Sequence, residues 1–399
     1  MAERNLDFDR IVDRRNTKSL KYDFAEKRGM PKDLLPLWVA DMDFKTSSYV
    51  QDALAKQVEH GIFGYSDTLT PYFEIVRSWM KRHHDWDVEE DWLVKTPGIV
   101  FALAMAVRAF TEPGDAVLIQ QPVYYPFSEV ISDNGRKIVS SDLYAGEDNR
   151  YHIDFEDFEQ KIRDNQVKLF FLCNPHNPVA RVWTREELTR MGEICQKYQV
   201  KVVSDEIHAD FVFKGKHQVF AAISKEFADF TITCTSPSKT FNLAGMMISN
   251  VIIRDEGLKE IWLGRHYNFD NPLSIAAAQA AYEKGEPWLE ELRAYLDENF
   301  RFTGEYLKEH LPKAKYRVSE ATYLAWVDLN AYFEPDEHLP LFFAYKAGVL
   351  LEGGNMFVQN SDGFIRLNLA CPKATLAEGL RRICEAVNTK HTEKYLGEK

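Results

Sequence analysis

Several short apolar runs in this sequence are followed at once by residues that could carry chemistry. The segment Thr96–Val100 opens a helical pattern, and free backbone N–H groups at a helix start can bind an anion. Ser236 and Ser238 follow a different run and add hydroxyl donors, so a phosphate would suit this set. The sequence contains neither a GxxxxGKS/T loop nor a GxGxxG motif, which excludes the main nucleotide-binding signatures.

A lysine, an aspartate and a tyrosine add the features of a particular cofactor. Lys239 could bind the phosphate, or its amine could form a Schiff base with an aldehyde. Asp205 follows a buried run and needs a positive partner, such as a protonated pyridine nitrogen, because an isolated buried carboxylate is costly. Tyr124 could offer its flat face to a heteroaromatic ring. Phosphate, aldehyde, pyridinium and ring together describe pyridoxal 5′-phosphate (PLP), whose sites contain a Schiff-base lysine and an acidic partner.

Each of these residues also has an ordinary structural interpretation. Asp205 could cap the next helix, and Lys239 alone would be a solvated surface charge. Arg366 could be half of a structural ion pair, and His208 a satisfied core histidine. What favours the cofactor is that the candidate residues occur together, at the ends of successive apolar runs.

These side chains require a scaffold that brings them to one place. Apolar runs rich in Val, Ile and Phe alternate with helical patterns, which predicts a mostly parallel α/β sheet flanked by helices. In such sheets ligands bind at the carboxyl ends of the strands. The predicted strands are Ala116–Gln120, Lys168–Cys173, Lys201–Ser204, Phe230–Thr235 and Asn250–Arg254, and the predicted helices are Val100–Phe110, Arg185–Tyr198 and Pro272–Glu283.

The pattern changes after about Pro287. A long charged helix, Trp288–Leu311, precedes two short alternating runs, Thr322–Leu329 and Gly363–Leu369, which predicts a smaller α+β domain. We therefore expect an N-terminal segment (1–45) that packs on the small domain, a large cofactor-binding domain (46–286) and a small C-terminal domain (287–399).

Composition restricts the class of protein. The 399 residues include 49 Lys and Arg against 61 Asp and Glu, a formal net charge of −12, which argues against nucleic-acid binding and against anionic membranes. The longest apolar stretch, Ile99–Val107, is too short to span a bilayer.

The five cysteines show no CxxC spacing, so neither a disulfide framework nor a metal site is expected. His83 and His84 lie in a charged helical stretch without an HExxH arrangement, which predicts a solvated face. We expect a reduced cytoplasmic protein.

Six segments, in this order, resemble the fold-type I PLP enzymes of the aminotransferase class I/II family, and more narrowly their cystathionine β-lyase (C–S lyase) branch. The segments are Trp38–Phe44 (WVADMDF), Phe63–Ser66 (FGYS), Asn174–Pro178 (NPHNP), Ser204–His208 (SDEIH), Thr235–Gly245 (TSPSKTFNLAG) and Phe364–Pro372 (FIRLNLACP). They extend from residue 38 to residue 372, nearly the whole chain.

The resemblance implies a role for each candidate residue. Lys239 would carry the Schiff base and Asp205 would pair with the pyridine N–H, with Tyr65 of a second subunit reaching the phosphate. Arg366 would grip the substrate α-carboxylate, which its planar fork fits bidentately. Further contacts to the ring would come from Asn177, His208 and Tyr124. The phosphate would be contacted by Gly98, Ile99, Val100, Ser236 and Ser238. Further contacts to the substrate would come from Ala40 and Asn177.

The chain departs from the family pattern at two positions. Ala180 stands where a glycine is common after Asn177, so the turn there is expected to differ slightly. Met247 stands eight residues after Lys239, where many aminotransferases carry a phosphate-binding arginine. This second departure favours a lyase over a standard transaminase.

The activity implied by the resemblance is α,β-elimination of L-cystathionine, or of a related cysteine S-conjugate, to a thiol, pyruvate and ammonia. Lys239 would remove the Cα proton, and the leaving group would depart from Cβ. An aminotransferase on the same fold is the nearest alternative, and a lyase-like protein with an added regulatory binding role is another. A shared site with Tyr65 implies a homodimer with twofold symmetry.

Overall fold

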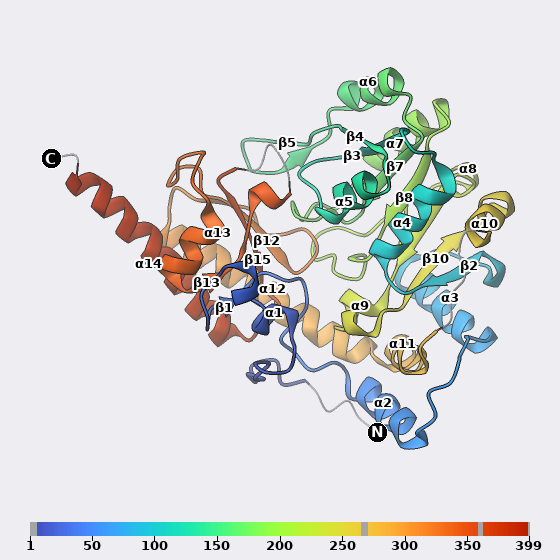
Figure 1. Cartoon of the computed structure of the whole chain (residues 1–399), viewed down its shortest axis with the longest axis horizontal. Helices are drawn as coiled ribbons and strands as arrows, with labels where there is room; N and C mark the ends of the chain where they lie inside the picture. Colours follow the sequence, from blue (N-terminus) through green and yellow to red (C-terminus); the bar gives the residue numbers. More distant parts are fainter. Residues whose placement is uncertain (1–5, 265–269, 358–361, 398–399) are drawn as a thin grey trace.

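A central sheet forms the largest element of the protein (Figure 1), whose computed structural model describes residues 6–264, 270–357 and 362–397. Among these residues the sheet has seven strands in the order β2-β10-β9-β8-β7-β3-β4. Their bounds are β2 (Leu93–Thr96), β3 (Ala116–Ile119), β4 (Lys137–Ser140), β7 (Leu169–Cys173), β8 (Lys201–Asp205), β9 (Thr231–Thr235) and β10 (Ser249–Ile253). β10 is antiparallel to β2 and β9, and the other pairs are parallel. Strands β2, β3, β7, β8 and β9 therefore all end at one edge.

Helices cover both faces of this sheet because its strands are apolar on both faces. Leu169 and Phe171 of β7 pack in one cluster with α4 (Ile99–Phe110), α5 (Pro126–Asp133) and α10 (Glu256–Leu263). Phe170 and Leu172 of the same strand pack in another cluster with α6 (Phe155–Asn165) and α7 (Arg185–Lys197). Alternate side chains of a strand point to opposite faces, so a continuous apolar run is what a sheet covered twice requires. The predicted fold class is confirmed, and each predicted strand is present.

The C-terminal part of the chain forms a second, smaller sheet. Its strands β11 (Lys315–Tyr316), β12 (Leu324–Asp328), β15 (Phe364–Asn368) and β14 (Glu352–Gly353) pair antiparallel in that order. The long helices α12 (Glu286–His310) and α14 (Lys373–Gly397) pack together beside it. The predicted helix and the two predicted runs thus occur where expected, while the domain boundaries themselves stay predictions.

The N-terminal segment is fastened to this C-terminal part. Strand β1 (Leu35–Pro36) pairs in parallel with β13 (Val349–Leu350). Farther along, Asn368 donates hydrogen bonds from its amide to the carbonyl oxygens of Val39 and Asp41, both at 2.6 Å. Asn368, on β15 of the second sheet, therefore fixes residues 39–41 next to the edge of the central sheet where its parallel strands end.

Helices α2 (Ser48–His60) and α3 (Thr70–His84) pack against α11 (Pro272–Lys284). On α3 the prediction of a solvated histidine pair is wrong. His84 is buried and its Nε2 lies 3.0 Å from Asp210 Oδ1, and His83 stacks on Trp79 with ring centroids 3.8 Å apart. The charged residues next to the two histidines suggested a solvent-exposed face. In the folded protein, His84 instead faces the carboxylate of Asp210.

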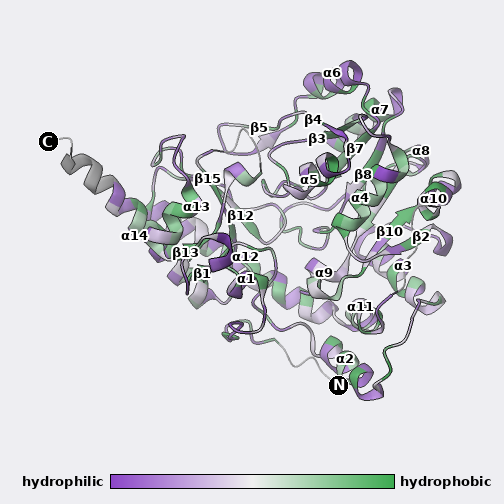
Figure 2. Cartoon of the chain, in the orientation of Figure 1, coloured by the Kyte–Doolittle hydropathy of each residue, from purple (hydrophilic) through white to green (hydrophobic). Residues whose placement is uncertain are grey.

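The remaining elements are short connections. They are α1 (Leu20–Asp23), η1 (Glu26–Arg28), η2 (Glu90–Trp92), β5 (Tyr144–Ala145), β6 (Tyr151–His152), α8 (Lys225–Ala228), α9 (Pro237–Thr240), η3 (Ala244–Met246), α13 (Leu339–Phe342), the π-helical turn η4 (Phe343–Ala347) and η5 (Gly354–Met356). Hydrophobic residues concentrate in the central strands and in the helix faces that meet them (Figure 2). Within the described part of the chain, none of the helices combines the length and apolar character that a bilayer span requires.

Candidate active site

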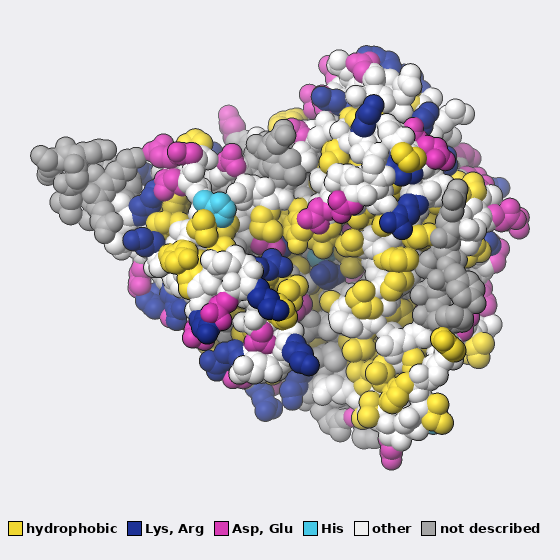
Figure 3. Space-filling model, viewed as in Figure 1, with side chains coloured by type: hydrophobic (Ala, Val, Ile, Leu, Met, Phe, Trp, Pro, Cys, Tyr) yellow, Lys and Arg dark blue, Asp and Glu magenta, His cyan; other side chains and the backbone are white. Residues whose placement is uncertain are grey.

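A cavity of about 300 Å³ lies at the edge where the five strands end. Figure 3 shows a hollow near the middle of this face of the molecule. Most of the residues singled out in the sequence line the cavity: Ala40, Gly98, Ile99, Val100, Tyr124, Asn177, Asp205, His208, Ser238 and Lys239. Three others, Tyr65, Ser236 and Arg366, do not belong to this lining. Residues at strand ends that lie as far apart in the sequence as Gly98 and Lys239 therefore meet in one cavity, as predicted, and Ala40, implied by the family resemblance, joins them.

Lys239 lies on the single turn α9, directly after strand β9. Its Nζ donates a 2.6 Å hydrogen bond to the carbonyl oxygen of Ala40. Burial lowers the pKa of the Lys239 amine to about 8, and the positive charge of Arg366 acts in the same direction. A substantial share of this amine is therefore neutral near pH 8, which is the form that attacks a carbonyl carbon or takes a proton.

Ser236 positions this turn instead of lining the cavity. Its hydroxyl caps α9 by accepting a 3.1 Å hydrogen bond from the Ser238 backbone N–H and donates to the carbonyl oxygen of Ile248 at 2.8 Å. The neighbouring Ser238 does line the cavity. Both hydroxyls were predicted to bind the phosphate, but of the two serines only Ser238 lies in the cavity lining.

Asp205 ends strand β8 as a buried carboxylate that forms no ion pair within the described residues. Its one hydrogen bond from the protein comes from the Ile207 backbone N–H at 3.1 Å. Burial raises the pKa of Asp205 to about 7, against the lowering effects of that hydrogen bond and of Lys239. Nearby, the buried Nδ1 of His208 has no hydrogen-bond partner among the described residues, and burial holds the pKa of this imidazole well below its ordinary value.

The start of α4 supplies the anion-binding part of the cavity. Gly98, Ile99 and Val100 line it, and the first N–H groups of a helix have no partner within the helix. A helix N-terminus also favours negative charge through its dipole. Met247, at the position where an arginine was noted as absent, also lines the cavity, with its side-chain methyl group close to Gly98 and a backbone φ of 53°.

Asn177 connects the cavity to Arg366. The Asn177 backbone carbonyl accepts from the Tyr124 N–H at 3.1 Å, and its side-chain Oδ1 accepts from Arg366 Nη1 at 2.8 Å. The turn that follows contains Ala180 with φ of 55°, a left-handed conformation in which glycine is free of strain. Ala180 thus adopts the conformation expected of a glycine. That the turn differs from the family's turn stays a prediction.

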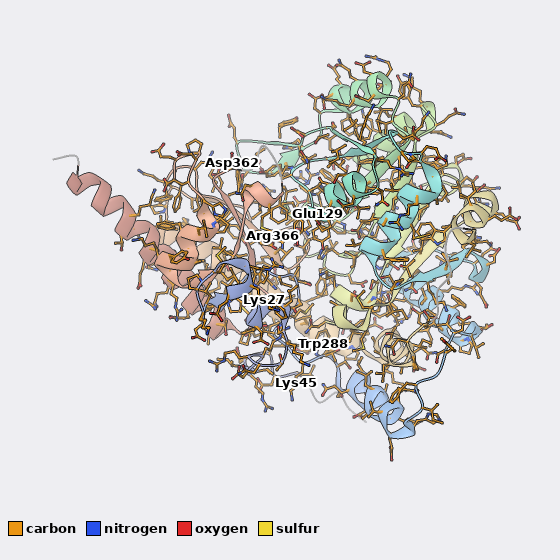
Figure 4. The ribbon with its side chains drawn as sticks, in the orientation of Figure 1. Lys27, Lys45, Glu129, Trp288, Asp362 and Arg366 are labelled. Carbon is orange, nitrogen blue, oxygen red and sulfur yellow. The ribbon has the colours of Figure 1, made fainter. Side chains whose placement is uncertain are left out.

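Arg366, labelled in Figure 4, is almost completely buried on β15 and is paired with a protein carboxylate. Glu352, its cross-strand register partner on β14, forms an ion pair with Nη2. The guanidinium lies over the Phe357 ring, with 4.7 Å to the ring centroid, and in the part of the chain that the structure describes its Nε meets no hydrogen-bond partner. Arg366 thus forms a structural ion pair and still has donors to offer a ligand.

Two residues that hold the site were missed in the sequence. Glu352 was missed because only strand register brings it against Arg366. Tyr323 donates a 2.7 Å hydrogen bond from its hydroxyl to the Ala40 carbonyl, the same oxygen that Lys239 contacts. The predicted run Thr322–Leu329 contained Tyr323, but a single tyrosine at the start of a strand carries no signal for such a contact.

Fold and site together define a PLP-type enzyme scaffold. A PLP pyridinium would give Asp205 the positive partner that it lacks, its ring oxygen would give His208 and Asn177 a partner, and its phosphate fits the α4 start and Ser238. The residues present therefore fit this cofactor.

Comparison with known proteins agrees with this class. Residues 32–383 match the aminotransferase class I and II family, and the chain belongs to that family. It is 43% identical to cystathionine β-lyase PatB from Bacillus subtilis (strain 168), over 96% of this chain and 100% of that protein. Among solved structures it is similar to a PLP-bound protein from Clostridium difficile 630, provisionally assigned as an aminotransferase (43% identity, TM-score 0.93, 96% and 99% covered). The PLP-bound C–S lyase of Staphylococcus hominis is 39% identical, with TM-score 0.91 and 95% and 97% covered.

Proposed function

We propose that this protein is a PLP-dependent carbon–sulfur β-lyase that releases a thiol, pyruvate and ammonia from L-cystathionine or a related cysteine S-conjugate. The observation that carries the proposal is that one cavity holds both Lys239, whose pKa falls to about 8, and Asp205, a buried carboxylate with no ion-pair partner among the described residues. The similarity to PatB and to the Staphylococcus hominis C–S lyase supports the lyase reaction among those that the family performs.

Bound PLP supplies an aldehyde for Lys239 and a protonated pyridine ring that withdraws electrons from the substrate Cα. The N–H groups at the start of α4 and the Ser238 hydroxyl hold the phosphate. Asp205 keeps the ring nitrogen protonated, because a nearby negative charge favours the cationic form.

The substrate is oriented by Arg366 and Asn177 and deprotonated by Lys239. Arg366 binds the α-carboxylate with the donors that Glu352 and Asn177 leave available. The Lys239 amine then takes the Cα proton, a task that suits a base with a pKa near the working pH. The thiolate departs from Cβ, and with one water the remaining fragment gives pyruvate and ammonia. The direction of the Cβ–S bond relative to the ring decides between elimination and transamination.

The complete site requires a second copy of the chain, with twofold symmetry. Tyr65 is 90% exposed and lies outside this chain's cavity. Exposed apolar side chains include Phe63 and Leu69 in the connection between α2 and α3, and Val100 and Phe101 at the start of α4. Figure 3 shows hydrophobic side chains gathered beside the hollow. An apolar surface of this kind favours burial against a partner, and a symmetric dimer would bring each Tyr65 toward the other chain's phosphate.

A reducing compartment fits the cysteines, and we propose a cytoplasmic enzyme. All five cysteines are free and buried. The buried thiols of Cys173 and Cys195 have pKa values raised by desolvation, so they are poor nucleophiles for disulfide exchange.

The test is a product analysis with purified, PLP-reconstituted protein and L-cystathionine in the absence of any keto acid. Elimination yields thiol and pyruvate in equal amounts without a second substrate. An aminotransferase would release neither product, because transamination leaves the C–S bond intact, and it would turn over only when a keto acid is added.

A further inference from the structure

Two opposite charges near Tyr125, the neighbour of the lining residue Tyr124, are not used by the proposed reaction. Arg28 lies at the end of η1 in the N-terminal segment, and Glu129 lies in the first turn of α5. Both side chains are exposed. Within the described part of the chain, neither side chain forms an ion pair or a hydrogen bond. Two opposite charges without a partner among the described residues, both near a residue next to the cavity, call for an explanation.

Arg28 is held in place by an aromatic ring. Its guanidinium lies over the Trp38 ring, 4.4 Å from the centroid. Trp38 is buried, donates from Nε1 to the Lys21 carbonyl oxygen at 2.9 Å, and packs with Leu350, two residues before Glu352. It stands two residues before Ala40, which lines the cavity. The stack fixes the stem of Arg28 near the site and leaves its donors available.

Glu129 is connected to the cavity through two tyrosines. It is one turn beyond Tyr125, whose neighbour Tyr124 lines the cavity; the two tyrosine rings are 5.5 Å apart. Tyr125 in turn contacts Phe357, the ring beneath Arg366. In Figure 4, Glu129 and Lys27, the neighbour of Arg28, lie on two sides of Arg366.

Electrostatics agree with this placement. Burial raises the pKa of the half-buried Tyr125 phenol; the charges of Glu352 and Glu129 act in the same direction, and those of Arg366 and Arg28 oppose it. Arg28 also acts on Glu352, the partner of Arg366. The inner pair Arg366–Glu352 and the outer residues Arg28 and Glu129 thus surround one phenol.

We propose that Arg28 and Glu129 form an outer subsite that binds the distal ammonium-carboxylate head of a two-headed thioether amino acid such as L-cystathionine. This inference rests on the proposed lyase function. With its scissile half held by Arg366, such a substrate extends through the mouth past Tyr125. Its distal carboxylate then meets Arg28 and its distal ammonium meets Glu129, and the released homocysteine is the half that the subsite held. Substrates without a distal head gain nothing from these two residues.

Four substrates separate the two contacts. L-Cystathionine carries both distal charges, S-(2-carboxyethyl)-L-cysteine the carboxylate alone, S-(2-aminoethyl)-L-cysteine the ammonium alone, and S-ethyl-L-cysteine neither. The variants are Arg28→Gln and Glu129→Gln, with Lys27→Gln as the matched control, since Lys27 is the exposed cation next to Arg28 in the same turn. The readout is kcat/KM for pyruvate release by the PLP-reconstituted full chain.

We expect Arg28→Gln to lower kcat/KM about threefold to fivefold for cystathionine and the carboxyethyl compound, the size of one partly exposed ion pair, and to leave S-ethyl-L-cysteine unchanged. Glu129→Gln should do the same for cystathionine and the aminoethyl compound. Lys27→Gln should change none of the four. Equal losses on all four substrates, or no loss on cystathionine, would overturn the subsite.

Equilibrium binding keeps the subsite testable apart from catalysis. In a Lys239→Ala background, which lacks the proposed base, dissociation constants for the four compounds should follow the same pattern. If wild-type protein releases no pyruvate from any compound, the lyase proposal fails, while the binding pattern still decides the subsite.

Discussion

At the scale of single residues, the lysine amine is the most informative group. Replacing Lys239 with Ala should lower pyruvate release at least about 10²-fold, since one group acts as nucleophile and base. Lys239→Arg keeps the positive charge but forms no Schiff base, and should be equally inactive. A Lys239→Arg protein with substantial activity would show that the charge, and not the amine, matters.

The depressed pKa of Lys239 predicts how the rate of PLP incorporation depends on pH. Only the neutral amine attacks the aldehyde. With a pKa of about 8, the rate of incorporation into cofactor-free protein should rise with pH through 8 and then level off. An amine with the ordinary pKa would give a rate that still rises above pH 9. Stopped-flow absorbance at fixed PLP concentration measures the profile.

Replacing Asp205 with Asn should stabilise the cofactor-free protein but slow the cofactor-bound enzyme. The pKa of Asp205 in the folded protein is raised to about 7, so between about pH 4 and pH 7 the folded state binds this proton more tightly than the unfolded state does. The free energy of unfolding therefore falls as the pH rises through this range. Cofactor-free Asp205→Asn should therefore be about 1–3 kcal/mol more stable than wild type at pH 8, with the gap closing near pH 4. With PLP bound, kcat should fall, because the amide cannot stabilise a cationic ring nitrogen. Urea titrations at both pH values, beside turnover measurements, check both halves.

At the scale of elements, the turn that carries Lys239 is fixed by a buried acceptor. Asp210 accepts hydrogen bonds from the Thr240 hydroxyl at 2.6 Å and from Trp79 Nε1 at 3.2 Å, and hydrogen bonding to His84 lowers its pKa to about 2 against the effect of burial. Thr240→Val removes one donor from a buried carboxylate and should cost about 1–3 kcal/mol of unfolding free energy. Thr240→Ser, which keeps the hydroxyl, should cost less than half of that. Equal losses in the two variants would point to packing instead.

The sequence predicted the elements better than the contacts between them. Strands such as β7 were predictable because every residue is apolar, and Lys239 and Asp205 because strand ends are where ligands bind. The Arg366–Glu352 pair depends on antiparallel register, which no local pattern records. The roles of Ser236 as a cap and His84 as a buried partner of Asp210 likewise depend on which side chain arrives from another part of the chain.

At the scale of the whole molecule, shared active sites predict complementation. Tyr65→Ala and Lys239→Ala should each be inactive or nearly so. In a mixed dimer, the Lys239→Ala chain supplies an intact Tyr65 to the site that retains Lys239. Dissociating and reassociating equal amounts should restore about a quarter of wild-type activity, because half of the dimers then carry one complete site. No recovery, with mixed dimers verified by differential tags, would contradict a shared site.

Covalent binding of PLP by Lys239, in the cavity at the strand ends, is tested most directly by borohydride reduction followed by peptide mass spectrometry. Reduction of PLP-reconstituted protein should place one pyridoxyl group on the peptide that contains Lys239, and Lys239→Ala should carry none at any position. A pyridoxyl group on another lysine, or none on wild-type protein that absorbs as a PLP complex, would contradict the account.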